Sequence, residues 1–169
     1  LAFSASGTMA MEVGGGSVGT RLYEMTWIDR TGRVTALDSS WTFRHSLSNG
    51  NLGWSLSPDG RRLAIGLNTN SGDDIWIKEL PTGPLSRLTF DSTSEERPRW
   101  TPDGQSVTYI VDGLSTLRQR PADGTGKEQV LVNTPNLVLR EGAWSADTEW
   151  LTLRVGGNGP TKLRNILAY

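Results

Sequence analysis

Two short charged segments, 44 residues apart, lie shortly before Trp100 and Trp144. Carboxylates and guanidiniums so close together can pair in structural salt bridges, or they can converge on an ion, a small anion or the peptide of a partner protein. The sequence leaves both interpretations open. Together with the single histidine, His45, the residues of this candidate binding site are Glu95, Glu96, Arg97, Arg99, Arg140 and Glu141.

The residue types that most hydrolases need are scarce. His45 is the single histidine, the chain has no cysteine, and no Gly-x-Ser-x-Gly segment is present to hold a nucleophile. One histidine without cysteine also leaves any zinc site to carboxylates. We therefore assign no catalytic residue, no metal ligand and no cofactor. The alternative is a weak or promiscuous hydrolase that acts on an ester or phosphate through the carboxylates of the charged segments, with or without a metal ion and His45.

Aspartates recur beside glycine, as in Asp59-Gly60 and Asp103-Gly104. Repeated carboxylates can bind metal, but an aspartate in a tight turn usually accepts backbone N–H groups. The Asp-x-Asp-x-Asp-Gly ladder of EF-hand loops is missing. We therefore interpret the whole set as turn residues: Asp59, Asp73, Asp74, Asp103, Asp112, Asp123 and Asp147.

A repeat positions these residues. A segment of the type Trp-Thr-Pro-Asp-Gly returns at Phe3–Gly7, Leu56–Gly60, Trp100–Gly104 and Trp144–Thr148. The last three copies are 44 residues apart, and the first interval of 53 residues is lengthened by a Gly-rich hairpin at Gly14–Gly19 and a polar insertion at His45–Asn51. In the last copy Ala146 and Thr148 replace proline and glycine, so we expect a less tight corner there.

Each copy predicts the same order of short elements, namely a strand that ends at the Ser or Thr, a corner and a hairpin. Apolar residues alternate in the second strands, which are predicted at Thr8–Val13, Arg62–Leu67, Ser106–Val111 and Trp150–Val155. The third strands are predicted at Leu22–Asp29, Asp74–Leu80, Leu114–Arg120 and Lys162–Tyr169. Fourth strands follow at Arg33–Leu37, Leu85–Phe90 and Glu128–Val132. Four antiparallel strands every 44 residues is the period of a β-propeller blade.

We therefore predict an all-β chain of about four propeller blades, at approximately residues 1–52, 53–96, 97–140 and 141–169. A β-sandwich also has many short strands, but it does not repeat one turn sequence at a fixed interval. The last blade lacks its outermost strand, so we expect a second copy of the chain to complete the ring as a homodimer. In that arrangement Leu1–Val13 and Trp150–Tyr169 form the interface.

Two aromatic side chains share one position in the repeat. Trp100 and Trp144 are equivalent, so both are predicted to pack between blades. Trp41 lies outside the repeat, and for this residue contact with a ligand or partner stays open.

Charge and hydropathy exclude two classes of partner. Seventeen basic and eighteen acidic residues are interspersed, with a formal net charge of −1. This balance lacks the basic face that binding to a phosphate backbone requires, so no nucleic-acid partner is expected. The longest apolar stretches, such as Leu151–Leu153, are too short to span a bilayer.

Several of these segments together match a known repeat. Trp100–Gly104 and its copies, Asp74-Ile75-Trp76 and Ser86-Arg87-Leu88-Thr89 resemble the TolB-like, or PD40, β-propeller repeat, best over residues 54–133. Met25–Arg33 followed by Leu56–Ile65 is also similar to propeller regions appended to some bacterial serine/threonine kinases. The resemblance implies a ring of six or more blades, a sensor or interaction module, and a periplasmic or extracytoplasmic location. We therefore expect a non-catalytic scaffold that binds a protein or a small ligand at the mouth of the central channel.

Overall fold

The computed structural model describes residues 2–3, 9–15, 22–44, 53–69, 72–111, 113, 115–156 and 164–168. Within these residues the regular structure consists of sixteen β-strands, and no helix long and apolar enough to cross a membrane occurs among them. The all-β prediction is confirmed.

The strands form four antiparallel sheets, each built from strands that follow one another in the chain. The first sheet contains β1 (Ala2–Phe3), β2 (Met9–Gly15), β3 (Leu22–Ile28) and β4 (Val34–Ala36), with β5 (Phe43–Arg44) also paired to β3. The second contains β6 (Trp54–Leu56), β7 (Arg62–Thr69), β8 (Gly72–Glu79) and β9 (Leu85–Arg87). The third contains β10 (Glu96–Trp100), β11 (Ser106–Val111), β12 (Thr116–Pro121) and β13 (Gln129–Asn133). The fourth contains β14 (Val138–Trp144), β15 (Leu151–Gly156) and β16 (Arg164–Ala168).

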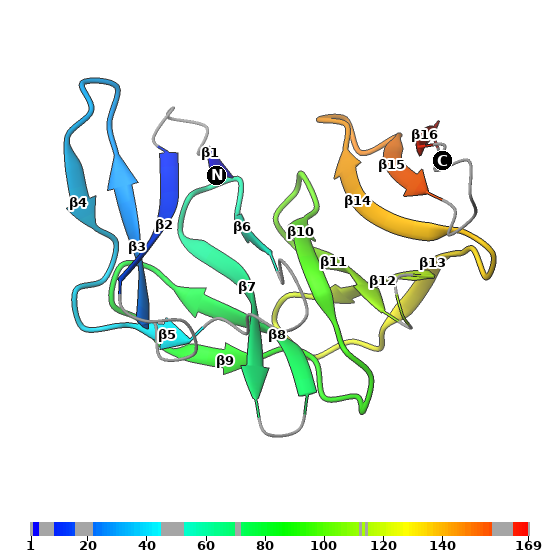
Figure 1. Ribbon diagram of the computed structural model, residues 1–169, viewed down its shortest axis with the longest axis horizontal. Coiled ribbons are helices and arrows are strands. Elements are labelled where there is room, and N and C mark those ends of the chain that lie inside the picture. The colour runs from blue at the N-terminus through cyan, green and yellow to red at the C-terminus, as the bar shows by residue number, and fades with distance from the viewer. Residues whose placement is uncertain are drawn as a thin grey trace.

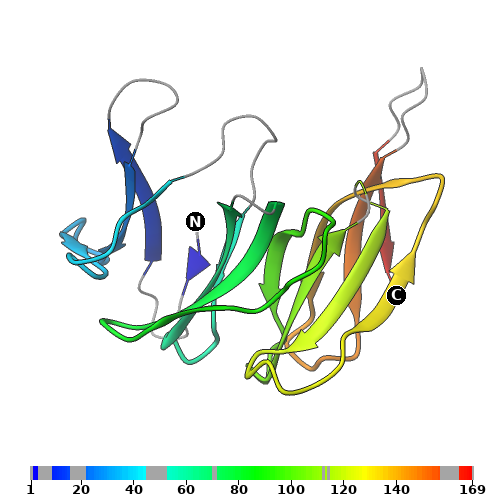
Figure 2. The same ribbon diagram turned by 90° about the horizontal axis from the view of Figure 1, so that it is seen from below.

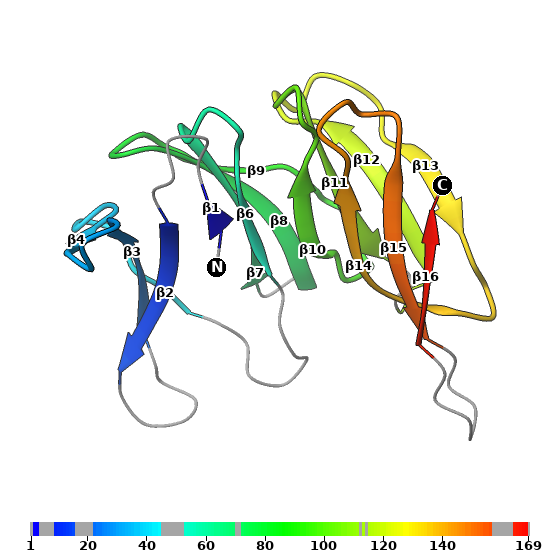
Figure 3. The same ribbon diagram turned by 90° about the horizontal axis from the view of Figure 1, so that it is seen from above.

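The sheets are arranged as blades of an open arc. In Figure 1 the first strands of the four sheets, β1, β6, β10 and β14, lie along the concave side, and β4, β9 and β13 lie on the outside. Neighbouring first strands contact one another along this inner side. Figures 2 and 3, seen from opposite sides, show the sheets standing next to one another in chain order. This is the arrangement of propeller blades around an axis.

The second, third and fourth blades share the same hydrogen-bonded corner after their first strands. In the second blade the Ser57 hydroxyl donates to Asp59 at 2.6 Å, and Asp59 accepts the backbone N–H of Arg61 at 3.0 Å. Gly60 follows with a φ of 72°, a region that glycine enters without steric cost. The third blade repeats these bonds around Asp103, with Gly104 at a φ of 68°. These hydrogen bonds confirm the turn interpretation of the two aspartates.

The corner of the fourth blade differs from our expectation. The Ser145 hydroxyl donates to Asp147, and the Thr148 N–H donates to the Ser145 carbonyl at 3.1 Å, as in the second and third blades. Thr148 takes the glycine position with a φ of 66°. The prediction of a looser corner was therefore wrong, because the surrounding hydrogen bonds impose the same turn on a β-branched residue, at a steric cost.

Apolar side chains fill the spaces between successive blades. Between the first two blades, Met25 and Phe43 pack with Leu63 and Ile65. The next interface contains the buried cluster Ala64, Ile75, Ile77, Leu88, Trp100, Val107, Tyr109, Val111 and Ala122. The interface of the last two blades contains Ile110, Leu117, Leu139, Leu151, Leu153 and Val155. Successive residues of a strand point to opposite faces, so the second and third blades present apolar side chains to the blades on both sides of them.

The tryptophans have structural roles in these interfaces. Trp100 is only 6% exposed, its Nε1 donates to the Ser55 carbonyl at 2.9 Å, and the Arg62 guanidinium lies 4.5 Å from its ring centre. Trp144 is half-buried against the cluster of the last two blades. Trp41, for which a ligand or partner contact was left open, is partly buried and stacks on Phe43 with ring centres 5.0 Å apart.

A buried ion pair links the first two blades. Lys78 Nζ on β8 lies 2.7 Å from Asp38 Oδ2, and the two side chains are only 4% and 2% exposed. The hydrogen bond from Lys78 and those from Ser40 lower the pKa of Asp38 to about 2. Because a lone buried charge is costly, loss of either partner would destabilise this interface.

Candidate functional site

The first strands of the third and fourth blades each carry a β-bulge. In β10 the pairing with β11 shifts between Glu96 and Arg99, and in β14 the pairing with β15 shifts between Leu139 and Glu141. Arg97 lies in the first bulge with a φ of 60°, which is uncommon for a residue other than glycine. Bulges redirect side chains from the regular alternation of a strand. Here they occur at the two charged segments identified in the sequence.

Gly53, directly before β6, brings the second blade close to Arg97. Its φ is 77°, and a Cβ atom added to it would lie 3.1 Å from the Arg97 Cα. Any larger residue would therefore be strained by its φ and crowded by the neighbouring backbone. The glycine permits two blades to approach at the inner rim.

The redirected side chains surround a cavity of about 160 Å³, which we call the arginine pocket. Its lining comes from the second, third and fourth blades and consists of Gly53, Arg97, Arg99, Arg140, Glu141 and Arg154. The structure thus brings together four of the predicted site residues, Arg97, Arg99, Arg140 and Glu141, from segments that are 44 residues apart.

Arg154 was missed by the sequence reasoning. It lies on β15, where Leu151, Leu153 and Val155 are buried in the interface with the third blade. Alternation places Arg154 on the opposite face, directly across from Glu141 in the strand register. The apolar alternation of Leu151–Val155 was therefore the signal that could have identified it.

The arginines of the third blade are partly engaged by the protein. Arg97 Nε lies 3.2 Å from Glu96 Oε2, and its Nη1 donates to the Arg140 carbonyl across the blade interface. Arg99 Nη1 donates to the carbonyls of Trp54 at 3.2 Å and Pro98 at 3.0 Å. Burial lowers the pKa of Arg99, Glu141 opposes this effect, and the like charge of Arg97 adds to it. The guanidinium remains charged at neutral pH, because arginine does not lose its proton in proteins.

Glu141 supplies the negative charge of the lining. Its Oε2 lies 3.1 Å from Arg154 Nε, and the two side chains are 53% and 39% exposed. The buried Arg154 Nε forms no hydrogen bond of good geometry within the part of the chain that the structure describes. This pair is open to solvent, so its contribution to stability is small.

Glu95 does not line the arginine pocket. Its side chain is fully buried, and it accepts hydrogen bonds from the hydroxyls of Thr93 at 2.8 Å and Thr89 at 3.1 Å. Burial raises the pKa of Glu95 to about 7, the two hydroxyls oppose the shift, and negative charge on Asp74 adds to it. Glu95 therefore belongs to the interface of the second and third blades. Glu96 pairs with Arg97, and burial raises its pKa as well.

Two other predictions concern acidic and metal-binding residues. Asp73 and Asp74 were interpreted as turn residues, which is wrong, because both are buried in β8, and Asp74 pairs with Arg87 at 2.7 Å. Asp123 does form a turn, accepting the Thr125 N–H at 3.0 Å.

Asp112 and His45 lie outside the described residues. Among the residues that are described, no three His, Cys, Asp or Glu side chains lie close enough to hold a metal ion.

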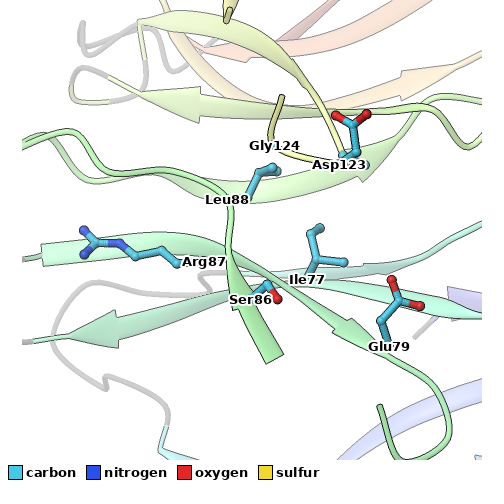
Figure 4. A pocket seen from close by; sticks show the side chains of 8 residues that line it. Ile77, Glu79, Ser86, Arg87, Leu88, Asp123 and Gly124 are labelled. Carbon is cyan, nitrogen blue, oxygen red and sulfur yellow. The ribbon is translucent and has the colours of Figure 1, made fainter. Parts of the chain in front are cut away.

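A second cavity, of about 180 Å³, lies between β8, β9 and the turn after β12 (Figure 4). Figure 4 shows Ile77, Ser86 and Leu88 at its centre, whereas the Arg87 guanidinium points away. Arg87 donates instead to Asp74 at 2.7 Å and to the Thr89 carbonyl at 2.8 Å. Asp123, an acidic residue of this cavity, accepts hydrogen bonds from Thr125 within its own turn. Two charged residues of this cavity, Arg87 and Asp123, are thus bound within the protein, and the arginine pocket is the better candidate for a ligand site.

Comparison with curated proteins finds partial matches. No protein-family model matches the chain. It is 28% identical over 102 residues to "Tricorn protease homolog 1" of Streptomyces coelicolor, covering 59% of this chain and 9% of that protein. It is 31% identical over 107 residues to "Uncharacterized peptidase YuxL" of Bacillus subtilis, covering 59% of this chain and 16% of that protein. The chain thus spans less than a fifth of the length of either relative.

Solved structures match nearly the whole chain. TolB from Acinetobacter baumannii aligns with a TM-score of 0.58 and 16% identity, over 99% of this chain and 42% of that one. A TolB described as putative, from Agrobacterium tumefaciens, gives 0.64 and 19%, over 88% and 53%. An oligogalacturonate lyase in complex with manganese gives 0.57 and 11%, over 88% and 50%. At these identities the comparisons report on architecture. The chain therefore has the TolB-like β-propeller fold, and its described residues form an open arc of blades within that fold.

Proposed function

We propose that this chain is a non-catalytic propeller module that binds an anionic group of a small molecule or a protein at the inner rim, in the arginine pocket. The observation that carries the proposal is that four arginines from the third and fourth blades line one cavity. Like charges repel when they are held together, and the repulsion is stronger where solvent is partly excluded. An anion between them relieves the repulsion and accepts charge-assisted hydrogen bonds.

The location of the pocket supports binding. The first strands of the blades line the concave side of the arc, where a closed propeller has the mouth of its channel. Concave sites with a few convergent polar groups are the usual places for ligands. A cluster of charges of one sign also attracts ligands of the opposite charge before they make contact with the protein.

The curated relatives fit a recognition role for this part of the fold. Both carry peptidase names, and this chain corresponds to 9% and 16% of their lengths. A segment of that size suits a recognition module within a larger protein. In this chain the corresponding partner would be a ligand or protein that offers negative charge to the rim.

Calorimetric titration with citrate, a compact polyanion, tests the proposal. We expect saturable binding to the wild-type chain and at least roughly threefold weaker binding to Arg140→Gln, because one cation of the lining is removed. Arg61→Gln is the matched control, since Arg61 is exposed and lies outside the pocket. Absence of saturable binding, or equal weakening by both substitutions, would contradict the proposal.

The last sheet of the arc ends in an edge strand, β16. β16 pairs with β15, and no further strand pairs with β16 among the described residues. An edge strand offers backbone groups for pairing, and we propose that a second copy of the chain completes the ring, with the homodimer interface at Leu1–Val13 and Trp150–Tyr169.

A further inference from the structure

The charge balance of the arginine pocket limits what it can hold. Four arginines line the cavity, and Glu141 is the one carboxylate among the described residues of the lining. Glu96 pairs with Arg97 beside the cavity, so the four arginine charges are offset by two carboxylates, Glu96 and Glu141. The remaining excess is two positive charges. A monoanion would leave one of them uncompensated, whereas a dianion would balance the site.

The size of the cavity favours a compact ligand group. A volume of about 160 Å³ lies below the roughly 300–1,000 Å³ of pockets for drug-sized ligands, which suits a tetrahedral oxyanion and some water. Phosphate presents several acceptor oxygens in directions that guanidinium groups match with paired hydrogen bonds. A flat carboxylate offers only two oxygens and could engage fewer of the four arginines.

The arginines differ in what they can offer to such a ligand. Arg99 uses Nη1 for the Trp54 and Pro98 carbonyls, so it supplies charge while it ties the third blade to the second. Arg97 is similarly tied to the Arg140 carbonyl. Arg140 is exposed, and Arg154 is engaged through its contact with Glu141 at 3.1 Å. Arg140, and Arg154 once its exposed pair with Glu141 opens, are therefore the groups that can turn toward a ligand.

Resting on the proposed anion-binding function, we infer that the arginine pocket is a site for a phosphate-type dianion, held by Arg140 and Arg154. Glu141 pairs with the Arg154 guanidinium at 3.1 Å, and the ligand takes the place of this carboxylate. Glu141 is thus a competitor that sets the affinity, and the ligand is inorganic phosphate or the phosphate ester of a small molecule.

Calorimetric titrations at low ionic strength test this inference, with inorganic phosphate, sulfate, O-phosphoserine and acetate as probes. We expect phosphate and sulfate to bind at least about tenfold more tightly than acetate, because the second charge interacts with the same cations. Arg154→Gln should weaken phosphate binding about tenfold, and Glu141→Gln should strengthen it severalfold by releasing Arg154. Arg61→Gln should change neither value. O-phosphoserine binding at least as tightly as phosphate would identify an ester as the source, and weaker binding would identify free phosphate.

The outcomes separate this inference from the proposed function. Acetate binding as tightly as phosphate, or citrate binding without phosphate binding, would overturn the dianion site and leave an anion-binding rim. Weaker phosphate binding by Glu141→Gln would overturn the competitor role. If none of these anions binds to a chain whose thermal unfolding remains cooperative, both proposals fail. Arg154→Gln and Glu141→Gln remove the same exposed ion pair, so their opposite effects on binding cannot arise from its loss.

Discussion

Glu95 should make the stability of this protein depend on pH in the neutral range. Its carboxyl group is fully buried between the second and third blades, and the Thr89 and Thr93 hydroxyls are its hydrogen-bond partners. Burial raises its pKa from 4.5 to about 7. Between these two values the folded chain keeps a proton that the unfolded chain has lost. The free energy of unfolding should therefore fall as the pH rises through this window.

The size of the effect follows from the two pKa values. A difference between 4.5 and about 7 corresponds to about 3.5 kcal/mol, at roughly 1.4 kcal/mol per pKa unit. The contribution is fully present below pH 4.5 and is lost as the pH passes about 7, so most of it, on the order of 2–3 kcal/mol, should disappear between about pH 5 and pH 8. Glu95→Gln replaces the carboxyl group with a neutral amide of the same shape, which removes the titration.

Urea denaturation followed by tryptophan fluorescence at several pH values measures this effect. Urea is preferred to guanidinium chloride because it does not screen charges. Relative to wild type, Glu95→Gln should gain on the order of 2–3 kcal/mol of stability between about pH 5 and pH 8. Glu24→Gln, at an exposed carboxylate on β3, is the control and should follow the wild-type profile. Parallel profiles for Glu95→Gln and wild type would show that Glu95 is ionised throughout, and would refute the reasoning.

Three further predictions concern packing, the corners and assembly. Trp100→Ala should lower the free energy of unfolding by about 3–5 kcal/mol, because it empties a site that is 6% exposed; an unchanged urea midpoint would argue against inter-blade packing. Thr148→Gly should raise the free energy of unfolding by about 1 kcal/mol, because it relieves a φ of 66° at a β-branched residue. Gly60→Val, at the equivalent position, should lower it by about 1 kcal/mol or more. Urea denaturation measures both, and a lower free energy of unfolding for Thr148→Gly would argue against backbone strain at Thr148. Light scattering should give twice the chain mass of 18.4 kDa at micromolar concentration, and a monomeric mass would rule out the homodimer.

The strand pattern could be predicted from the sequence in detail. Ser106–Val111 was predicted as a second strand and is observed with the same bounds as β11. The neighbouring third strand was predicted at Leu114–Arg120 and is observed as β12 at Thr116–Pro121. These predictions succeeded because the alternation of apolar residues and the Pro-Asp-Gly corners are local signals that tertiary packing reinforces. The Thr148 corner failed as a prediction because neighbouring hydrogen bonds outweighed the local preference of threonine.

The candidate site was predictable only in part. The sequence by itself determined an all-β chain with a 44-residue repeat, apolar blade faces and two charged segments in equivalent positions. The tertiary structure decided which of these charges meet. The bulges in β10 and β14 turn Arg97, Arg99, Arg140 and Glu141 to one cavity. Glu95, one residue from Glu96, is buried on a different side, and Arg154 joins from another strand. Bulges and contacts between blades depend on the register and packing of strands far apart in sequence, whereas strand alternation and corners depend on adjacent residues.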